Sequence, residues 1–343
     1  MTEGNELIDN PQQYVTQLIG GYWAAQVACA AAALELPDRL ANGPATAEDL
    51  AQAAEAHAPS VRRLLRAMVS LGLCTQEADG RFALTEAGSY LRDGLPGSVR
   101  GRALFIGDRL WMQFSDLTHQ VKTGSRTQKV LGGAEGFEAM KNDPAGLHTF
   151  QQAMAESSRM AARGAMAAYD FARFERVLDL GGGYGGVLAE LLKGNPAQTG
   201  AVCDLPFLKD GAEAYLGAAG VADRAEFRGG SFFESVPAGF DLILMKFIIH
   251  DWGDEESRTI LRNSRQSADA GTTLVLIEQV VPDVVAFTPE HQAVIRGDLT
   301  MLAIGGKERT AEEYRVLLAE SGWRLEAITP AGAQFSVIEG RPA

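Results

Sequence analysis

The stretch Val177-Leu-Asp-Leu-Gly-Gly-Gly-Tyr-Gly-Gly186 joins an apolar run to a cluster of glycines, and Val187-Leu-Ala-Glu-Leu-Leu192 follows it. This order is typical of a buried strand, a tight loop and a helix. Glycines in such a loop let the backbone approach a ligand at the carboxyl end of the strand. We therefore expect a ligand-binding loop here. Its G-x-G-x-x-G pattern, at Gly181, Gly183 and Gly186, is weak evidence alone, because it suits a dinucleotide as well.

Strands alternate with helical stretches over residues 173–343, which we expect to form a ligand-binding catalytic domain. The alternation predicts an α/β fold with a seven-stranded, mostly parallel sheet covered by helices on both faces. The short loop 329–333 permits a hairpin, so we expect the last strand to run antiparallel. The expected strands are Arg176–Leu180, Thr199–Asp204, Ala225–Arg228, Asp241–Phe247, Thr272–Val281, Trp323–Ile328 and Gln334–Glu339.

Length and charge exclude several classes of protein. The chain has 343 residues, which makes two domains the simplest expectation. Its net charge of −13 argues against a nucleic-acid binder and against binding to an anionic membrane, since both need clustered Lys and Arg. Its three cysteines lie far apart, so we expect neither a metal site nor a disulfide framework. The acidic N-terminus and the short apolar run Tyr22–Leu34 favour a cytoplasmic protein without a membrane span.

Residues 1–100 are expected to form a mainly helical winged-helix domain. Thr46-Ala-Glu-Asp49 is a capping box that opens one helix, and Pro59 suits the first turn of the next. Asp79-Gly80 lies between two β-type runs and predicts a two-residue hairpin turn, the wing. Such a domain can bind DNA or serve packing and dimerisation. Acidic residues outnumber basic ones in it, which favours dimerisation.

Two carboxylates favour one cofactor over another. Asp204 ends the second strand, where an acidic side chain can accept hydrogen bonds from the hydroxyls of a ribose. Both NAD and S-adenosylmethionine (SAM) carry that ribose. Asp179 directly precedes the glycines, where it would repel a pyrophosphate but tolerate the cationic methionyl part of SAM. The loop also lies late in the chain, with no room for a substrate domain after it, so SAM is favoured and an NAD-dependent dehydrogenase is the weaker alternative.

Five short motifs carry the strongest indication of function: they are Leu178-Asp-Leu-Gly-Gly-Gly183, Asp204-Leu-Pro206, Gly230-Ser-Phe-Phe-Glu234, Met245-Lys-Phe-Ile-Ile-His-Asp-Trp252 and Gly305-Gly-Lys-Glu-Arg-Thr310. With them the chain resembles the SAM-dependent small-molecule O-methyltransferases, of the plant caffeate and flavonoid type and of the bacterial polyketide- and phenazine-tailoring type. The resemblance covers nearly the whole chain. It implies a C-terminal Rossmann-like SAM-methyltransferase fold and methyl transfer to a hydroxyl of an aromatic or polycyclic small molecule.

The resemblance also implies a role for each matching residue. His250 would be the general base, and Glu278 and Glu308 would flank and orient it. Ser231 departs from the family, which usually has Asp there, so we expect weaker recognition of the adenine amine. The residues implied to bind SAM are Asp179, Gly181, Gly182 and Gly183 around its methionyl end, Asp204 and Leu205 at its ribose, Ser231, Phe232 and Trp252 around its adenine, and Lys246 nearby.

His250 suits this chemistry on physical grounds. It ends an apolar strand, on the side of an open sheet where ligands bind. A phenol, with a pKa of about 10, is a poor nucleophile at neutral pH, and a neutral imidazole can take its proton. Asp251 follows directly, but successive side chains seldom face the same way, so we expect Glu278 or Glu308 to be the better orienting partner. We do not expect His148 or His291 to line the substrate pocket.

The acceptor is expected to lie under helices. Residues 101–172 indicate a helical linker that covers the substrate, and Val285–Ile304 would close the pocket as well. An apolar, aromatic lining fits an aromatic or polycyclic phenol. The expected wall residues are Trp111, Phe114, Phe150, Met154, Phe247 and Met301.

The Ala-rich helix Tyr14–Leu36 is apolar nearly all round, and such a helix favours burial. The resemblance implies that it is buried in a homodimer, with one subunit helping to wall the other's active site. Two alternatives stay open beside methyl transfer. The same fold could use SAM for a hydroxylase-like or decarboxylase-like reaction, or the chain could be a winged-helix regulator that senses a ligand. The sequence does not identify the acceptor.

Overall fold

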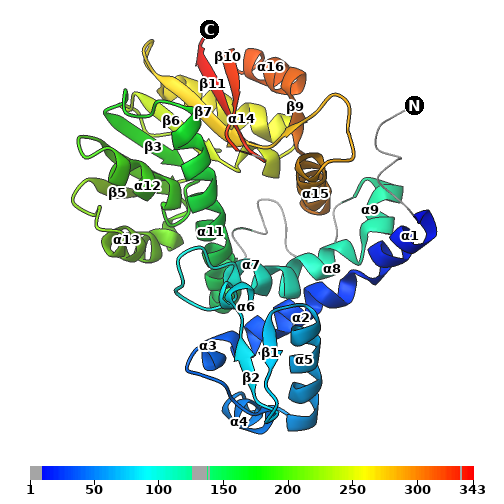
Figure 1. The fold of residues 1–343 in the computed structure, drawn as a ribbon. Helices are drawn as coiled ribbons and strands as arrows, with labels where there is room; N and C mark the ends of the chain where they lie inside the picture. The colour runs from blue at the N-terminus through cyan, green and yellow to red at the C-terminus, as the bar shows by residue number, and fades with distance from the viewer. Residues whose placement is uncertain (1–9, 126–136, 138–139, 333) are drawn as a thin grey trace. The chain divides into compact units, whose positions relative to one another are not determined.

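The computed structural model describes residues 10–125, 137, 140–332 and 334–343. The chain divides into two compact units, Met1–Met112 and Gln113–Ala343 (Figure 1). The three-part division at residues 100 and 172 that the sequence suggests stays a prediction.

The first unit is mainly helical, with one small hairpin. Thr46 caps a helix through the expected capping box with Asp49, and Pro59 lies in the first turn of the next helix. Its core includes Leu36, Leu65 and Phe82, all fully buried. Its elements are α1 (Pro11–Gly20), α2 (Tyr22–Ala33), α3 (Leu36–Leu40), α4 (Ala47–Ala53), α5 (Ala58–Ser70), β1 (Cys74–Gln76), β2 (Phe82–Leu84), α6 (Glu86–Ser89), α7 (Arg100–Phe105), the π-helix η2 (Ile106–Leu110) and α8 (Trp111–Phe114), which reaches into the second unit.

The turn of the hairpin differs from the expectation of two residues. The N–H of Glu77 donates to the carbonyl of Arg81 (2.8 Å), so the ladder of β1 and β2 closes on the three-residue loop 78–80. Gly80 takes a left-handed backbone with φ +88° and donates to the carbonyl of Glu77 (3.0 Å). A turn closed by a left-handed glycine is the usual form of a three-residue hairpin loop.

The second unit is a sheet between two layers of helices (Figure 1). Side chains alternate along each strand, so Val177 packs on one face and Leu178 on the other. The helices α11, α12 and α13 supply the core of the first face, and α14 and α16 that of the second. The helices of this unit are α9 (Leu117–Thr123), η3 (Met140–Asn142), α11 (Pro144–Ala168), α12 (Gly186–Gly194), η4 (Pro206–Leu208), α13 (Lys209–Ala218), η5 (Ile249–Asp251), α14 (Asp254–Ser267), α15 (Pro289–Ile304) and α16 (Ala311–Ala319).

The seven strands run in the order β10-β11-β7-β6-β3-β4-β5. All neighbouring pairs are parallel except those of β11, which is antiparallel to β7 and to β10, as the sequence predicts for the last strand. The order reverses between β3 and β6, and in open sheets ligands bind at the carboxyl ends of the strands beside such a point. The strands are β3 (Arg176–Leu180), β4 (Thr199–Asp204), β5 (Ala225–Gly229), β6 (Leu242–Lys246), β7 (Thr273–Glu278), β10 (Trp323–Pro330) and β11 (Ser336–Pro342).

One expected strand is in fact two. The stretch Thr272–Val281 divides into β7 and the short β8 (Val280–Val281). The second piece leaves the main sheet and pairs with β9 (Arg309–Thr310). The polar pair Glu278-Gln279 stands at the break, but the apolar residues on both sides are β-structure with different partners, so the sequence alone suggested one strand.

Candidate functional site

The glycine loop follows β3 where the sequence predicts it. Gly181 and Gly183 have φ values of +73° and +58°, a left-handed backbone that other residues rarely adopt. The middle glycine, Gly182, packs against a carboxylate, since a Cβ there would lie 2.6 Å from Cγ of Asp179. A Cβ on Gly183 would lie 2.8 Å from Oε1 of Gln151, a buried residue of α11 that the sequence analysis did not single out. The loop therefore has no room for side chains and exposes its backbone.

Asp204 lies at the end of β4, beside this loop. Its Oδ2 accepts from the N–H of Gly183 and its Oδ1 from the N–H of Leu205, both at 2.7 Å. Each carboxylate oxygen has a further lone pair, so the group can also accept from two ligand hydroxyls. Burial raises the pKa of Asp204. The geometry fits the predicted contact with a ribose.

Asp179 is fully buried under the loop. Its Oδ2 accepts from the N–H of Leu188 (3.3 Å), whereas its Oδ1 has no hydrogen-bond partner among the described residues. Burial raises its pKa to about 7, although Lys246 acts in the opposite direction. A buried acceptor without a donor is costly and favours a cationic or donor-rich ligand. This observation fits the methionyl part of SAM and disfavours a pyrophosphate.

Lys246 interacts electrostatically with Asp179 below the glycine loop and with the carboxylates near His250. Burial lowers the pKa of this lysine to about 8, while Asp179, Glu278 and Asp251 act to raise it. Its Nζ lies 4.4 Å from the ring centroid of Phe247. The side chain therefore lies between the carboxylate below the glycine loop and those near His250.

Three aromatic rings form a cluster beside the loop. Trp252 lies 4.7 Å from the ring of Phe233 and 6.0 Å from that of Phe232, measured between centroids. Phe232 also approaches Gly181, where a Cβ would lie 3.4 Å from its Cε1. Oγ of Ser231 accepts from the N–H of Phe233 (3.3 Å), so the hydroxyl retains its own hydrogen for a ligand. The structure thus brings together the residues expected around the adenine.

Two neighbours of this cluster were missed or only partly expected. Asn263 of α14 donates from Nδ2 to the carbonyls of Phe232 and Phe233, both at 2.9 Å, and so fixes the backbone of the aromatic turn. Phe150 reaches the cluster through Phe137, whose ring lies 6.0 Å from Phe150 and 6.2 Å from Trp252.

His250 lies in the short turn η5 after β6 and contacts two glutamates. Its Nδ1 lies 2.8 Å from Oε1 of Glu308 and 3.5 Å from Oε2 of Glu278. Oε1 of Glu278 accepts from the N–H groups of Ile248 and Ile249 at 3.1 and 2.9 Å. Glu308 is therefore the direct partner of the imidazole, and Glu278 mainly fixes the backbone of the turn.

Asp251 is a third carboxylate near the imidazole, although Glu308 is the closer partner, as expected. Oδ1 of Asp251 lies 3.4 Å from Nε2 of the imidazole. Both residues lie in a 3₁₀ turn, where successive side chains are closer in direction than in a strand. The nitrogen that would face an acceptor hydroxyl thus has a carboxylate next to it.

The carboxylates control the protonation of the imidazole. Burial lowers the pKa of His250, but Glu308, Glu278 and Asp251 outweigh it and raise that pKa to about 10. Burial raises the pKa of Glu278 to about 7 and that of Asp251 to about 6. The carboxylates around the ligand-free ring therefore favour its protonated form and bring its pKa close to that of a phenol.

The potential ligand atoms of His250, Glu278 and Glu308 lie within 4.8 Å of one another, close enough for a metal ion. However, Oε1 of Glu278 already accepts from two backbone N–H groups, and Oε1 of Glu308 contacts the imidazole. The arrangement is that of a histidine oriented by carboxylates.

Arg309 fixes the turn that carries His250. This arginine is fully buried and donates to the carbonyls of Ile249 and Trp252, each at 2.9 Å. It also donates to Oδ1 of Asp254 (2.8 Å). The sequence analysis quoted it within a motif without giving it a role.

The expected wall residues meet different outcomes. The ring of Phe247 stacks on His250 at a centroid distance of 5.0 Å, and its left-handed backbone (φ +59°) is uncommon for a bulky residue. Met154 and Met301 are partly buried on α11 and α15. Trp111 belongs to the first unit, where its side chain is exposed, and Phe114 is exposed in the second.

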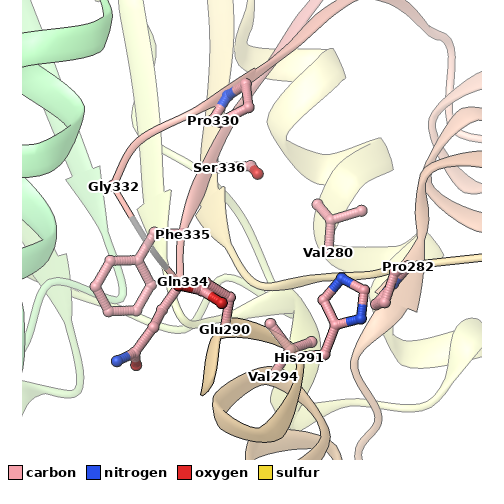
Figure 2. Close-up of a pocket in the computed structure, with 10 residues that line it drawn as sticks. All are labelled: Val280, Pro282, Glu290, His291, Val294, Pro330, Gly332, Gln334, Phe335 and Ser336. Carbon is pink, nitrogen blue, oxygen red and sulfur yellow. The ribbon is translucent and has the colours of Figure 1, made fainter. Parts of the chain in front are cut away.

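His291, which we did not expect to line the substrate pocket, lines a pocket of the second unit (Figure 2). This pocket lies between β8, the start of α15 and the turn from β10 to β11. No pattern in the sequence indicates it, since the turn and the helix are far apart along the chain.

Comparisons with known proteins agree with this geometry. The model of the O-methyltransferase domain matches residues 114–324, and that of the O-methyltransferase dimerisation domain matches residues 16–93. The chain belongs to the O-methyltransferase family. The phenazine O-methyltransferase PhzM of Lysobacter antibioticus is 35% identical to this O-methyltransferase over 347 residues, covering 100% of both chains. The O-demethylpuromycin-O-methyltransferase of Streptomyces alboniger is 34% identical and covers 96% of this chain and 89% of its own.

Solved structures extend the likeness of this O-methyltransferase to the whole fold. The crystal structure of LaPhzM has a TM-score of 0.91 at 34% identity and covers 97% of this chain and 100% of its own. Human N-acetylserotonin methyltransferase, crystallised with SAM, has a TM-score of 0.89 at 26% identity and covers 98% of each chain.

The protein is therefore a SAM-dependent O-methyltransferase, as the sequence predicts. Neither the dehydrogenase, the non-methyl reaction nor the ligand-sensing regulator is favoured. Across the described residues, no helix of this O-methyltransferase combines the length and the apolarity needed to span a bilayer.

Proposed function

We propose that this enzyme methylates a hydroxyl of a multi-ring aromatic small molecule, with His250 as the base and Glu308 as its orienting partner. The observation that carries the proposal is the 2.8 Å contact between Nδ1 of His250 and Oε1 of Glu308. This contact leaves Nε2 as the nitrogen available to an acceptor, in the arrangement of base and orienter typical of activated nucleophiles.

SAM, when bound, supplies a methyl group on a positively charged sulfur. Asp204 would bind its ribose, and the backbone of Gly181–Gly183 would lie along its methionyl part. Asp179 offers an unpaired buried acceptor below that loop. The cluster of Phe232 and Trp252 would pack against its adenine, with Ser231 offering a hydroxyl beside it. Lys246 would position Asp179 and the carboxylates near His250.

The acceptor oxygen needs to lose its proton while it is aligned with the methyl group. In its neutral form His250 takes that proton at Nε2, and the carboxylate of Glu308 stabilises the imidazolium that results. Because the pKa of His250 is about 10, close to that of a phenol, little free energy separates phenol with imidazole from phenolate with imidazolium. Phe247 fixes the plane of the imidazole by stacking on it.

The class of acceptor rests on relatives and on the aromatic surroundings of the site. One relative is a 2,7-dihydroxy-5-methyl-1-naphthoate 7-O-methyltransferase at 35% identity, and NcsB1 was crystallised with 2-hydroxy-5-methyl naphthoic acid. Another relative, at 32% identity, is an 8-amino-8-demethylriboflavin N,N-dimethyltransferase. An aromatic amine is therefore the second candidate acceptor.

We also propose that the enzyme is a homodimer formed through its first two helices. Five large apolar side chains of α1 and α2 are at least 42% exposed, which is unusual for adjacent helices of a monomer. The match to a dimerisation domain over residues 16–93 covers most of these positions. The exposed residues are Val15, Leu18, Ile19, Tyr22 and Trp23.

The three cysteines are free and buried, which suits the cytoplasm.

The experiment is incubation of the enzyme with SAM and a panel of hydroxylated and aminated naphthalenes and phenazines, followed by mass spectrometry. Methylated oxygen on at least one multi-ring phenol supports the proposal, and methylation of amines alone would contradict it. Calorimetry with Asp204→Ala tests the ribose contact, since unchanged affinity for SAM would exclude that role. Light scattering that finds a monomer at micromolar concentration would refute the dimer.

A further inference from the structure

The pocket that contains His291 is smaller than a complete small-molecule site. Its volume is about 200 Å³, and complete small-molecule sites usually measure at least about 300 Å³. Apolar walls come from Val280, Val294 and Phe335, and polar groups from Glu290, His291 and Ser336 (Figure 2). The dimensions suit one end of a ligand, a ring edge with a polar substituent.

Contacts between packed residues connect the lining of the pocket to the catalytic cluster in two ways. Ser336, the first residue of β11, pairs in register with Glu278 of β7, and residues paired across strands project to the same face. Phe335 packs on Phe247 at a centroid distance of 5.3 Å, and Phe247 in turn stacks on His250. One aromatic layer therefore separates the pocket from the base.

The helix α15 gives the second connection. Residues three and four apart share a face of a helix, so His291 and Val294 lie on the same face as Gly297 and Asp298. A Cβ on Gly297 would lie 3.3 Å from Oε1 of Glu308, and Oδ1 of Asp298 accepts from the N–H of Glu308 (3.0 Å). The face that lines the pocket thus ends at the glutamate that orients the base.

The polar groups define what the pocket recognises. Nδ1 of His291 accepts from the N–H of Ala286 (2.8 Å), so a neutral ring carries its hydrogen on Nε2, which is a donor. The carboxylate of Glu290 only accepts, and the hydroxyl of Ser336 does both. A group that accepts from His291 and donates to Glu290 satisfies both, whereas a carboxylate would be repelled by Glu290.

We propose that this pocket is a distal subsite of the acceptor, which binds a neutral polar substituent such as a carboxamide at the end of the molecule remote from the methylated oxygen. The proposal rests on the proposed function, because it takes His250 as the place where the acceptor reacts. It makes Glu290 and His291 determinants of specificity that act at a distance from the chemistry.

Three acceptors with one ring system test the subsite: 2-naphthol, 6-hydroxy-2-naphthamide and 6-hydroxy-2-naphthoic acid. Their binding is measured by calorimetry on the enzyme saturated with S-adenosylhomocysteine, so no turnover is needed. We expect the amide to bind roughly tenfold more tightly than 2-naphthol, the effect of one net hydrogen bond, and the acid to bind more weakly than the amide.

Two variants separate the determinants. Glu290→Gln is isosteric and exposed, so the fold is preserved, and it should raise the affinity of the acid relative to that of the amide about tenfold. His291→Phe should abolish the preference for the amide over 2-naphthol while leaving the affinity for 2-naphthol unchanged. Gln292→Ala, on the exposed side of the same helix, is the control and should change neither ratio.

The outcomes distinguish a failure of the subsite from a failure of the proposed function. Equal binding of the amide and 2-naphthol, no binding of any of the three, or an unchanged ratio of acid to amide in Glu290→Gln would overturn the subsite. The same compounds are then incubated with SAM. The expected ranking in binding without methylation of any compound would leave the subsite standing and remove the proposed function. Methylation of all three without a ranking would do the reverse.

Discussion

Nδ1 of His250 lies 2.8 Å from Oε1 of Glu308, and the two residues are 58 positions apart in the chain. The histidine comes from the turn after β6 and the glutamate from the residue before β9. Their contact depends on Arg309, which follows the glutamate and donates to the backbone of the histidine turn. The orientation of the base is thus fixed by a neighbour of its own partner.

Glu308→Gln should lower kcat by roughly 10²-fold, because the amide cannot stabilise an imidazolium as a carboxylate does. The affinity for SAM should stay unchanged, since the glutamate does not contact the glycine loop. Steady-state kinetics and calorimetry measure the two quantities. Glu312→Gln, an exposed glutamate paired with Arg315, is the matched control. A kcat within twofold of the wild type would rule out the orienting role.

The pH dependence of kcat/KM should report the carboxylates around His250. Burial lowers the pKa of the imidazole, but its three carboxylate neighbours raise it to about 10, so activity should increase from neutral pH towards that value. Removing the charge of Glu308 destabilises the imidazolium and should shift this rise in kcat/KM to lower pH. The same acceptor is used for both proteins, so that its own ionisation cancels. A rise in kcat/KM at the same pH in wild type and Glu308→Gln would contradict the electrostatic account.

The affinity for SAM should rise as the pH increases from about 6 to 8. Burial raises the pKa of Asp179 to about 7, so its carboxyl group is protonated at the lower pH and charged at the higher one. A charged carboxylate attracts the cationic ligand, and a protonated one does not. Asp179→Asn should flatten the dependence, whereas Asp210→Asn, an exposed residue of α13, should leave it intact. The same slope in wild type and Asp179→Asn, measured by calorimetry across this range, would exclude Asp179 as the titrating group.

Arg309→Met should destabilise the protein by roughly 3 kcal/mol, because the carbonyl groups of Ile249 and Trp252 lose their donor at 2.9 Å and retain Oγ of Ser257 at 3.3 Å. Urea unfolding followed by fluorescence measures this free energy. Arg315→Met removes an exposed arginine and should change it by less than about 0.5 kcal/mol. If the two variants unfolded at the same urea concentration, Arg309 would have no special part in fixing the turn.

Periodic apolar sequence predicted most of the fold. The strands β3 and β4 have the predicted bounds, because each is a buried run that ends at a glycine or an acidic residue. The predicted two-residue hairpin loop and the predicted single strand Thr272–Val281 were wrong in detail. Both depend on local backbone hydrogen bonds, which residue types specify poorly.

The candidate site was predictable where a motif gives one residue, and not where tertiary packing brings residues together. The cluster of His250, Glu278 and Glu308 was predicted from motifs and assembles in the structure. The additional contact of Asp251 with the imidazole was not predicted, because the sequence does not distinguish a 3₁₀ turn from the end of a strand. His291 needs the turn between β10 and β11 to form its pocket, and no pattern along the chain connects those segments.

The most direct test of the account compares wild type with His250→Ala, using SAM that carries a CD3 group, a hydroxynaphthalene acceptor and EDTA throughout. Mass spectrometry follows the labelled product, and calorimetry measures the affinity for SAM. The account predicts transfer of the label to oxygen by the wild type despite EDTA, and a loss of roughly 10²-fold or more in kcat for His250→Ala with unchanged SAM affinity. Near-normal turnover by His250→Ala, or transfer that needs added metal, would contradict it.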